Sequence, residues 1–126
     1  MPQLSLVSNN MTTTPSIAWL NNLSDVIERL REVYPDMTLN QVSVLINVAS
    51  HPGITQRGIM EKTGLADSSA SRIVAILSDY GNRGTGPFHL IELHESSDDR
   101  RVKELHLTKK GKDLVRDLTK AIARGK

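Results

Sequence analysis

The chain of 126 residues lacks cysteine altogether, and only four of its side chains are aromatic. The absence of cysteine excludes a disulfide framework, a thiolate zinc site and a thiol-based redox switch. No apolar run approaches the roughly 20 residues that a membrane-spanning helix needs. No Lys or Arg precedes Arg29, whereas a secretory signal begins with a basic segment. We therefore expect a soluble protein, located in the cytoplasm and without membrane contact.

Positive charge is concentrated toward the C-terminal end of the sequence. Residues 1–99 carry 6 basic and 11 acidic side chains, whereas residues 100–126 carry 10 basic and 3 acidic ones. The overall net charge of +2 therefore hides two regions of opposite sign. A basic segment of this kind either attracts nucleic acid or forms a solvated terminal helix, and charge alone favours neither interpretation.

The first predicted helix has more apolar surface than one small core can use. Residues 1–13 predict a mobile arm, after which Thr14 suits an N-cap and Pro15 the first helical position. Two apolar stripes follow, formed by Ile17, Leu20, Leu23, Ile27, Leu30 and Tyr34 and by Trp19, Val26 and Val33. Together they span roughly 200° of the helix surface. This width predicts that the helix also packs against a second copy of the chain.

A second helix is predicted to begin after Thr38. Thr38 and Gln41 form the pattern of a capping box, in which each side chain accepts a hydrogen bond from the backbone of the other residue. The expected buried face consists of Leu39, Val42, Leu45, Ile46 and Ala49. The segment His51-Pro52-Gly53 then ends the helix.

Two further helices joined by a tight glycine turn predict a helix-turn-helix over residues 55–81. The first begins after the N-cap Thr55 and ends at Gly64, and the second is capped by Asp67 and extends to about Tyr80. The apolar side of the second helix comprises Ala70, Ile73, Val74, Ile76, Leu77 and Tyr80, and the opposite side comprises Ser68, Ser71, Arg72, Ala75 and Asp79, with Ser69 at the boundary. Short hydroxyl side chains and one arginine near a helix N-terminus suit close approach to DNA. An ordinary helical hairpin with a polar face fits the same pattern.

A β-hairpin is predicted over residues 88–107, with strands at 88–95 and 101–107. The polar turn between them carries Arg100 and Arg101 at its tip. A hairpin that follows a helix-turn-helix is a wing, and arginine on its tip can enter the minor groove of DNA, where the negative potential is strong. Thr108 then caps a final helix that extends to about residue 124, with an apolar stripe formed by Leu114, Val115, Leu118, Ala121 and Ile122.

From Thr38 to Leu118 the sequence resembles the MarR-like family of winged helix-turn-helix regulators. Asp99-Arg100-Arg101 is similar to the family's D-x-R wing tip, and Leu107-Thr108-Lys109-Lys110-Gly111 is similar to its L-T-x-x-G entry into the terminal helix. The segments Gly64-Leu65, Ser68-Ser69 and Ser71-Arg72-Ile73-Val74, followed by Leu77, resemble its recognition-helix pattern. The resemblance implies a mainly α fold with a small β-hairpin wing (α+β), in which residues 14–126 form a single winged-helix domain.

The resemblance further implies a homodimer joined through the first and last helices. Each recognition helix would lie in a major groove of double-stranded DNA, and each wing would lie in a flanking minor groove. By position, Arg101 would enter the minor groove, and Asp99 would orient it. Contacts with bases and phosphates would come from Ser68, Ser69, Ser71 and Arg72. Apart from the resemblance, the hypothesis of DNA binding assigns Arg100 to the minor groove as well, and Lys103, Lys109 and Lys110 to phosphates.

Two departures from the family pattern affect these expectations. About eight residues, 82–89, look inserted before the wing, and such an insertion would change the angle of the wing. The region after Thr108 holds about one helix where the family usually has two. The dimer interface would then be smaller or differently arranged, and a monomer stays an open alternative.

Four side chains of the predicted hairpin have metal-ligand chemistry. Glu92 and His94 share one face of the first strand, and Glu104 and His106 share one face of the second. They either form cross-strand His–Glu pairs or, where the register brings the two faces together, offer ligands to a divalent metal. The pairs are favoured, so no metal or other cofactor is predicted.

Neither catalysis nor an effector site has a specific motif. The serines lack an H-x-D or G-x-S-x-G context, so no catalytic residue is assigned and no enzyme is predicted. Trp19 and Tyr34 either belong to the core, the favoured interpretation, or line a pocket for a small-molecule effector.

Two functions from different classes fit the sequence. The first is a sequence-specific regulator that binds double-stranded DNA, a repressor acting as a homodimer on an inverted repeat. The second is a winged-helix protein-interaction module, such as a mobile-element protein that captures a host factor, because a fold does not fix a function.

Overall fold

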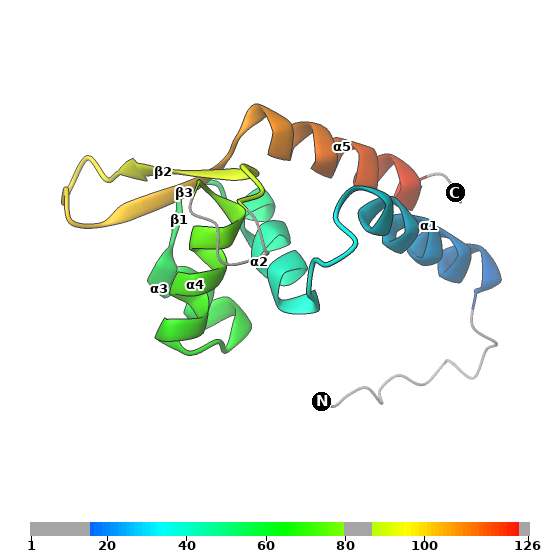
Figure 1. Cartoon of the computed structure of the whole chain (residues 1–126), viewed down its shortest axis with the longest axis horizontal. Coiled ribbons are helices and arrows are strands. Elements are labelled where there is room, and N and C mark those ends of the chain that lie inside the picture. The colour runs from blue at the N-terminus through cyan, green and yellow to red at the C-terminus, as the bar shows by residue number, and fades with distance from the viewer. Residues whose placement is uncertain (1–15, 80–86, 124–126) are drawn as a thin grey trace.

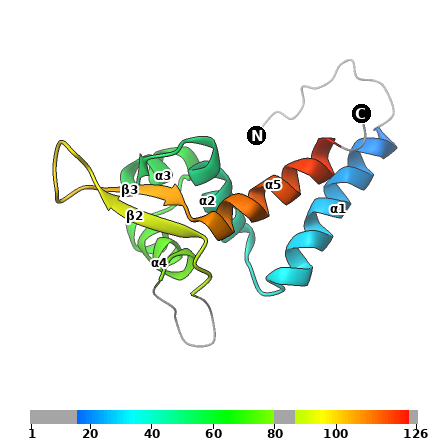
Figure 2. The same cartoon turned by 90° about the horizontal axis from the view of Figure 1, so that it is seen from above.

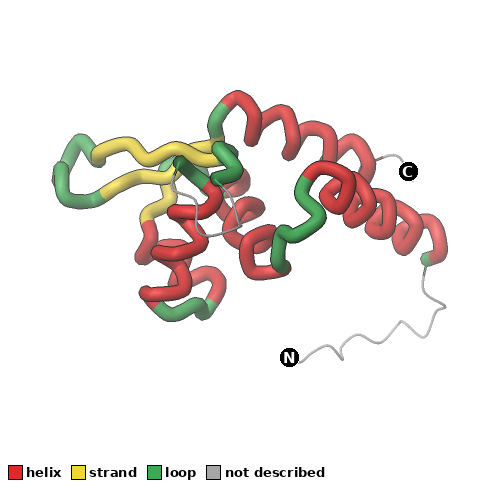
Figure 3. Tube along the Cα trace, in the orientation of Figure 1, coloured by secondary structure: helices red, strands yellow, loops and turns green. Residues whose placement is uncertain are grey.

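The structure is a computed structural model that describes residues 16–79 and 87–123. Its helices and strands are α1 (Ile17–Val33), α2 (Leu39–Ser50), β1 (Ile54–Thr55), α3 (Gln56–Thr63), α4 (Asp67–Leu77), β2 (Ile91–Glu95), β3 (Lys103–Leu107) and α5 (Lys109–Ala123). In Figures 1 and 3, α2, α3, α4 and the sheet form one body. The β2–β3 hairpin projects from one side of it, and α1 with α5 projects from the other. The expected mainly α fold with a small β wing is confirmed.

One hydrophobic core holds this body together. Its buried side chains are Val44, Leu45, Val48, Ile59, Ala70, Ile73, Val74, Leu77, Leu90, Ile91 and Leu105. They come from α2, α3, α4 and the hairpin, so the helix-turn-helix and the wing share one core. Removing such aliphatic surface from water contributes about 25 cal/mol per Å² and is the main stabilising term. The predicted apolar side of α4 is confirmed as far as Leu77, while Tyr80 lies outside the described residues.

Three predicted helix boundaries are confirmed because a few neighbouring residues determine each of them. The Thr38 hydroxyl accepts a hydrogen bond from the backbone N–H of Gln41 at 3.1 Å, and the Gln41 side chain accepts one from the N–H of Thr38 at 3.0 Å. The Thr55 hydroxyl caps α3 by accepting a single hydrogen bond from the backbone N–H of Gly58. Gly64 ends α3 with φ = 78°, a left-handed conformation that glycine adopts without strain.

The predicted starts of α1 and α4 are corrected. The N-cap of α1 is Ser16 rather than Thr14, because the Ser16 hydroxyl accepts the backbone N–H of Trp19; Thr14 itself lies outside the described residues. Asp67 does not cap α4 but is its first residue, and Ala66 is the N-cap. The Asp67 carboxylate instead accepts a hydrogen bond from the side-chain amide of Gln56, the first residue of α3.

The buried face of α2 also differs from the prediction. Val44, Leu45 and Val48 are fully buried against the body, whereas Leu39 is 87% exposed and Ile46 is 51% exposed. Two apolar stripes run along this helix, and the body covers only the one formed by Val44 and Val48. The other stripe faces the groove between α1 and α2.

The sheet contains a strand that periodicity did not predict. β1 has only two residues, and it pairs antiparallel with β3, which pairs antiparallel with β2, so the strand order is β1-β3-β2. Leu105 lies at the centre of this sheet, opposite Ile54 on one side and Leu93 on the other. The wing is thereby fixed to the start of α3 through hydrogen-bonded backbone.

α4 and β2 are both shorter than predicted, because the chain between them hydrogen-bonds to the end of α4. The backbone N–H groups of Phe88, His89 and Leu90 donate to carbonyls at the end of α4 and of its C-cap Ser78. α4 therefore ends at Leu77 rather than near Tyr80, and β2 begins at Ile91 rather than at Phe88. Residues 82–86 of the expected insertion lie outside the described residues, as do residues 1–13, Gly81 and Arg124.

α1 and α5 lie side by side and form a two-helix arm, seen from above in Figure 2. Arg29 of α1 donates a hydrogen bond to the Asp117 carboxylate of α5 at 2.6 Å. This ion pair raises the pKa of the Arg29 guanidinium above its ordinary value. Of the α1 side chains, only Leu30 is buried. The arm therefore leaves most of the apolar surface of α1 in contact with solvent.

The arm joins the body through a tight contact at the start of α5. The Thr108 N–H donates to the carbonyl of Leu90 at 3.0 Å, and its hydroxyl donates to the carbonyl of His89 at 2.7 Å. Thr108 also caps α5, as predicted, because its hydroxyl accepts the N–H of Gly111 at 3.0 Å. Close by, the ring of Tyr34 packs edge-on against Phe88.

Candidate nucleic-acid interface

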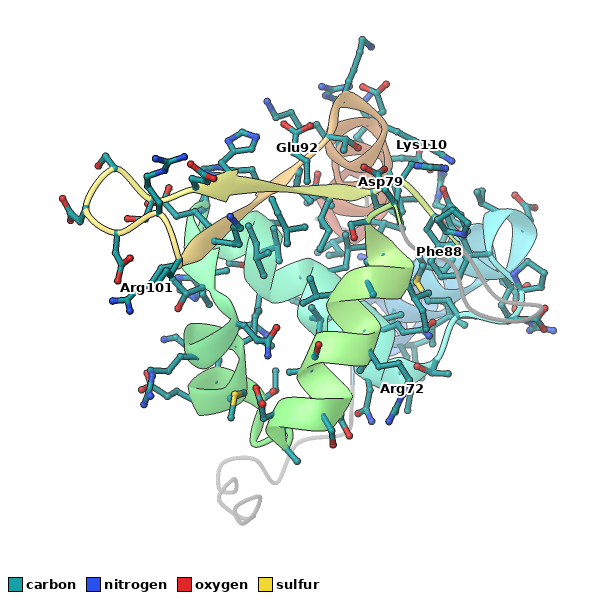
Figure 4. All side chains as sticks on the ribbon, turned by 60° about the vertical axis from the view of Figure 1, so that its left-hand side comes forward. Arg72, Asp79, Phe88, Glu92, Arg101 and Lys110 are labelled. Carbon is teal, nitrogen blue, oxygen red and sulfur yellow. The ribbon has the colours of Figure 1, made fainter. Side chains whose placement is uncertain are left out.

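The outer face of α4 carries the predicted polar side chains. Ser68, Ser71 and Arg72 are exposed, and Ser69 is half-buried at the boundary with the apolar side. The Arg72 side chain has no hydrogen-bond or ion-pair partner in residues 16–79 and 87–123. Figure 4 shows it directed outward from α4. Its guanidinium is thus available for a partner outside the chain.

At the tip of the hairpin, Asp99 holds Arg101 in a defined orientation. The Arg101 guanidinium donates to both carboxylate oxygens of Asp99 at 3.2 Å, and the Arg101 backbone N–H donates to Oδ1 at 3.0 Å. These bonds lower the pKa of the Asp99 carboxyl, chiefly through the guanidinium, so the carboxylate is charged at neutral pH. The Arg101 side chain is nevertheless 89% exposed. Asp99 therefore orients the arginine without covering it.

The other predicted cations are engaged within the chain. Arg100 and Lys103 both lie near the Glu95 carboxylate, at 3.4 and 3.5 Å. Lys109 pairs with Asp113 at 3.2 Å, and the ammonium of Lys110 lies over the ring of Tyr34, 5.7 Å from its centre. The two predicted groups thus occupy separate elements, α4 and the hairpin, and the lysines of α5 lie at the junction with the arm.

Arg57, which has no predicted role, lies beside the hairpin. Arg57 of α3 lines an open hollow of about 420 Å³ together with Arg101 and Lys103 of the hairpin. Arg57 follows Thr55 and Gln56 and therefore lies in the first turn of the first helix of the helix-turn-helix. This position was the available sign of a role in DNA binding, because that helix crosses the DNA backbone in helix-turn-helix proteins.

Comparison with known proteins agrees with this architecture. The model of the MarR family matches residues 36–81, which contain α2, α3 and α4. RV1404 from Mycobacterium tuberculosis is 22% identical, with a TM-score of 0.66, and the match covers 81% of this chain and 64% of that one. A mutant of S. aureus MepR bound to an oligodeoxyribonucleotide is 22% identical, with a TM-score of 0.65 and coverages of 82% and 69%. The chain therefore has a winged-helix fold that is similar to that of MarR-family proteins.

A third solved structure, the transcriptional repressor CouR bound to a 23-mer DNA duplex, is 27% identical to this chain. Its TM-score is 0.59, and the match covers 84% of this chain and 68% of CouR. No protein in a search of curated sequences matches the chain. The chain thus spans just under two thirds of RV1404 and about two thirds of CouR.

The hairpin does bring the two His–Glu pairs onto one face. Glu92 lies opposite His106 and His94 lies opposite Glu104, and the two imidazole rings stack with their centres 4.6 Å apart. Each histidine contacts the glutamate of its own strand. Among the described residues, no three His, Asp or Glu side chains are arranged to hold a metal ion. The favoured His–Glu pairs therefore form within each strand, between His94 and Glu92 and between His106 and Glu104, rather than across the strands as predicted.

Trp19 and Tyr34 do not share a pocket in this chain. Trp19 lies near the free end of the arm, beside Leu20 and Ile122, whereas Tyr34 lines an apolar groove of about 270 Å³ between α1 and α2. Tyr34 is half-buried and packs against the core, as favoured, whereas Trp19 is 63% exposed and does not belong to it. Within the described residues, no helix is long and apolar enough to span a membrane.

Proposed function

We propose that this protein is a sequence-specific regulator of transcription, a repressor that binds an inverted repeat of double-stranded DNA as a homodimer in the cytoplasm. The observation that carries the proposal is the exposed Arg101, held by Asp99 at the tip of a hairpin beside a helix with a polar outer face. MepR and CouR, which are similar to the chain, are bound to DNA in their structures.

In the proposed complex, α4 lies in the major groove. The short side chains of Ser68, Ser69 and Ser71 let its backbone approach the base edges, and Arg72 pairs with a guanine or a phosphate. Arg101 enters the adjacent minor groove, where the negative potential is strongest, and Arg100 and Lys103 approach the flanking phosphates.

The operator itself provides the first test of this function. Selection from random genomic fragments should enrich an inverted repeat whose half-sites lie about one helical turn, roughly 10 bp, apart. Binding to it should weaken steeply as salt rises, because cationic side chains displace counterions from phosphates. If no motif is enriched and pull-down recovers a stable protein partner, the chain is an interaction module and the proposal is wrong.

We further propose that the exposed face of α1 forms the homodimer interface. In the arm, Ile17 is 67% exposed, Trp19 63% and Leu23 56%, and apolar surface of this extent marks an interaction site. Leu23→Glu should convert a dimer into a monomer with the chain mass of 13.9 kDa, as measured by light scattering during gel filtration. Because Leu23 is exposed in the single chain, the variant should keep its helical circular dichroism.

A matched control is Asn21→Glu, which adds the same charge to the exposed polar side of α1. This variant should elute as the wild type does. A wild-type chain that is monomeric at micromolar concentration would refute the homodimer, as would a Leu23→Glu variant that still dimerises.

A further inference from the structure

We propose that the hollow between α3 and the hairpin binds one phosphodiester group of the DNA backbone, with Arg57 as its main ligand. The inference rests on the proposed DNA binding and adds a third element, α3, to the interface formed by α4 and the wing. Arg57 would position the protein on the duplex, whereas α4 would read the bases.

The shape and charge of the hollow fit this occupant. Three cationic side chains line it, Arg57 from α3 and Arg101 and Lys103 from the hairpin. No carboxylate lines it, Thr55 and Gln56 supply further polar groups, and the remaining lining is apolar, formed by Val74, Leu93, Val102 and Leu105. Its volume of about 420 Å³ is large enough for a phosphate group. A phosphodiester carries one negative charge and accepts hydrogen bonds in the fork geometry that a guanidinium offers.

Arg57 differs from the two hairpin cations in its pairing. Arg101 is bound to Asp99, and Lys103 lies 3.5 Å from Glu95. The Arg57 side chain is exposed and has no hydrogen-bond or ion-pair partner within the part of the chain that the structure describes. It can therefore bind a phosphate without first giving up an internal ion pair.

A hydrogen bond joins the start of α3, which carries Arg57, to the start of α4. The side-chain amide of Gln56, the residue before Arg57, donates to the Asp67 carboxylate at 2.7 Å. This bond joins the first residue of α3 to the first residue of α4. When the start of α4 lies against base edges, the start of α3 consequently lies near the DNA backbone, which the first helix of a helix-turn-helix crosses.

The test is the salt dependence of DNA binding by Arg57→Gln, measured with the operator selected for the wild type and with a scrambled duplex. Loss of one phosphate contact should make the slope of log K against log salt shallower by about 0.9. Affinity should fall about tenfold for both duplexes, because a phosphate contact carries no sequence information. The thermal midpoint should not change, because the side chain is exposed and unpaired.

Lys120→Gln provides the control, since it removes one positive charge from an exposed position on α5. It should change neither the slope nor the affinity. Wild-type affinity and slope in Arg57→Gln, with the wild type itself bound to DNA, would overturn this inference alone. A loss confined to the operator would also overturn it, because Arg57 would then contact a base. Failure of the wild type to bind either duplex would overturn the proposed function as well.

Discussion

Arg101→Ala should weaken binding to the selected operator about 10- to 100-fold, as measured by fluorescence anisotropy at moderate salt. The expected loss is large because Asp99 holds the guanidinium in place before DNA arrives, so little conformational entropy is lost on binding. The protein itself should fold as before, since the Arg101 side chain is 89% exposed and an exposed ion pair contributes little to stability.

The position of Arg101, rather than its charge, should account for this loss. Arg116→Ala is the matched control, because Arg116 forms a similar exposed pair with Asp113 at 2.8 Å, but on α5. This variant should bind the operator as tightly as the wild type. Asp99→Asn should produce part of the Arg101→Ala effect, because it keeps the arginine but weakens its orientation. Wild-type affinity in Arg101→Ala would remove the wing from the proposed interface.

Gly111→Ala should lower the free energy of unfolding by about 3 kcal/mol or more. A Cβ at this position would lie only 2.1 Å from the carbonyl oxygen of Leu90, and that carbonyl also accepts the hydrogen bond from Thr108. The backbone cannot withdraw without breaking the contact that joins α5 to the base of the wing. Urea denaturation followed by circular dichroism measures the change.

Gly64→Ala separates this close contact from the general effect of losing a glycine. Gly64 has open space around its Cα but a positive φ of 78°, so alanine there should cost about 1 kcal/mol in backbone strain. Gly111→Ala should therefore lower the free energy of unfolding more than Gly64→Ala does. Equal losses in the two variants would mean that the arm and the body are not joined as tightly as the structure indicates.

The sequence predicted those features that a few adjacent residues determine. The capping box of Thr38 and Gln41, the cap at Thr55 and the glycine turn at Gly64 depend only on local hydrogen bonds and backbone conformation. The polar face of α4 was likewise predictable, because its helical period separates small polar from aliphatic residues without ambiguity.

Features that depend on distant parts of the chain were predicted wrongly or not at all. α2 carries two apolar stripes, and the packing of α3, α4 and β3 against it decides that Val44 and Val48 are buried while Leu39 is exposed. β1 is two residues long and forms a strand only because β3 lies beside it. The sequence places Arg57 in the first turn of the helix-turn-helix, but its place beside Arg101 follows only from the pairing of β1 with β3.

The pairing of charges at the hairpin tip affects how the protein would search for its operator. Between Glu95 and Lys103, three basic side chains are balanced by three acidic ones, so the tip appears neutral beyond a Debye length of about 8–10 Å. The tip therefore exerts almost no electrostatic attraction on distant phosphates. It would attract DNA only when the Arg101 guanidinium reaches the floor of the minor groove. The wing would therefore help to distinguish the operator from other sequences without slowing the diffusion of the protein along DNA that contains no operator.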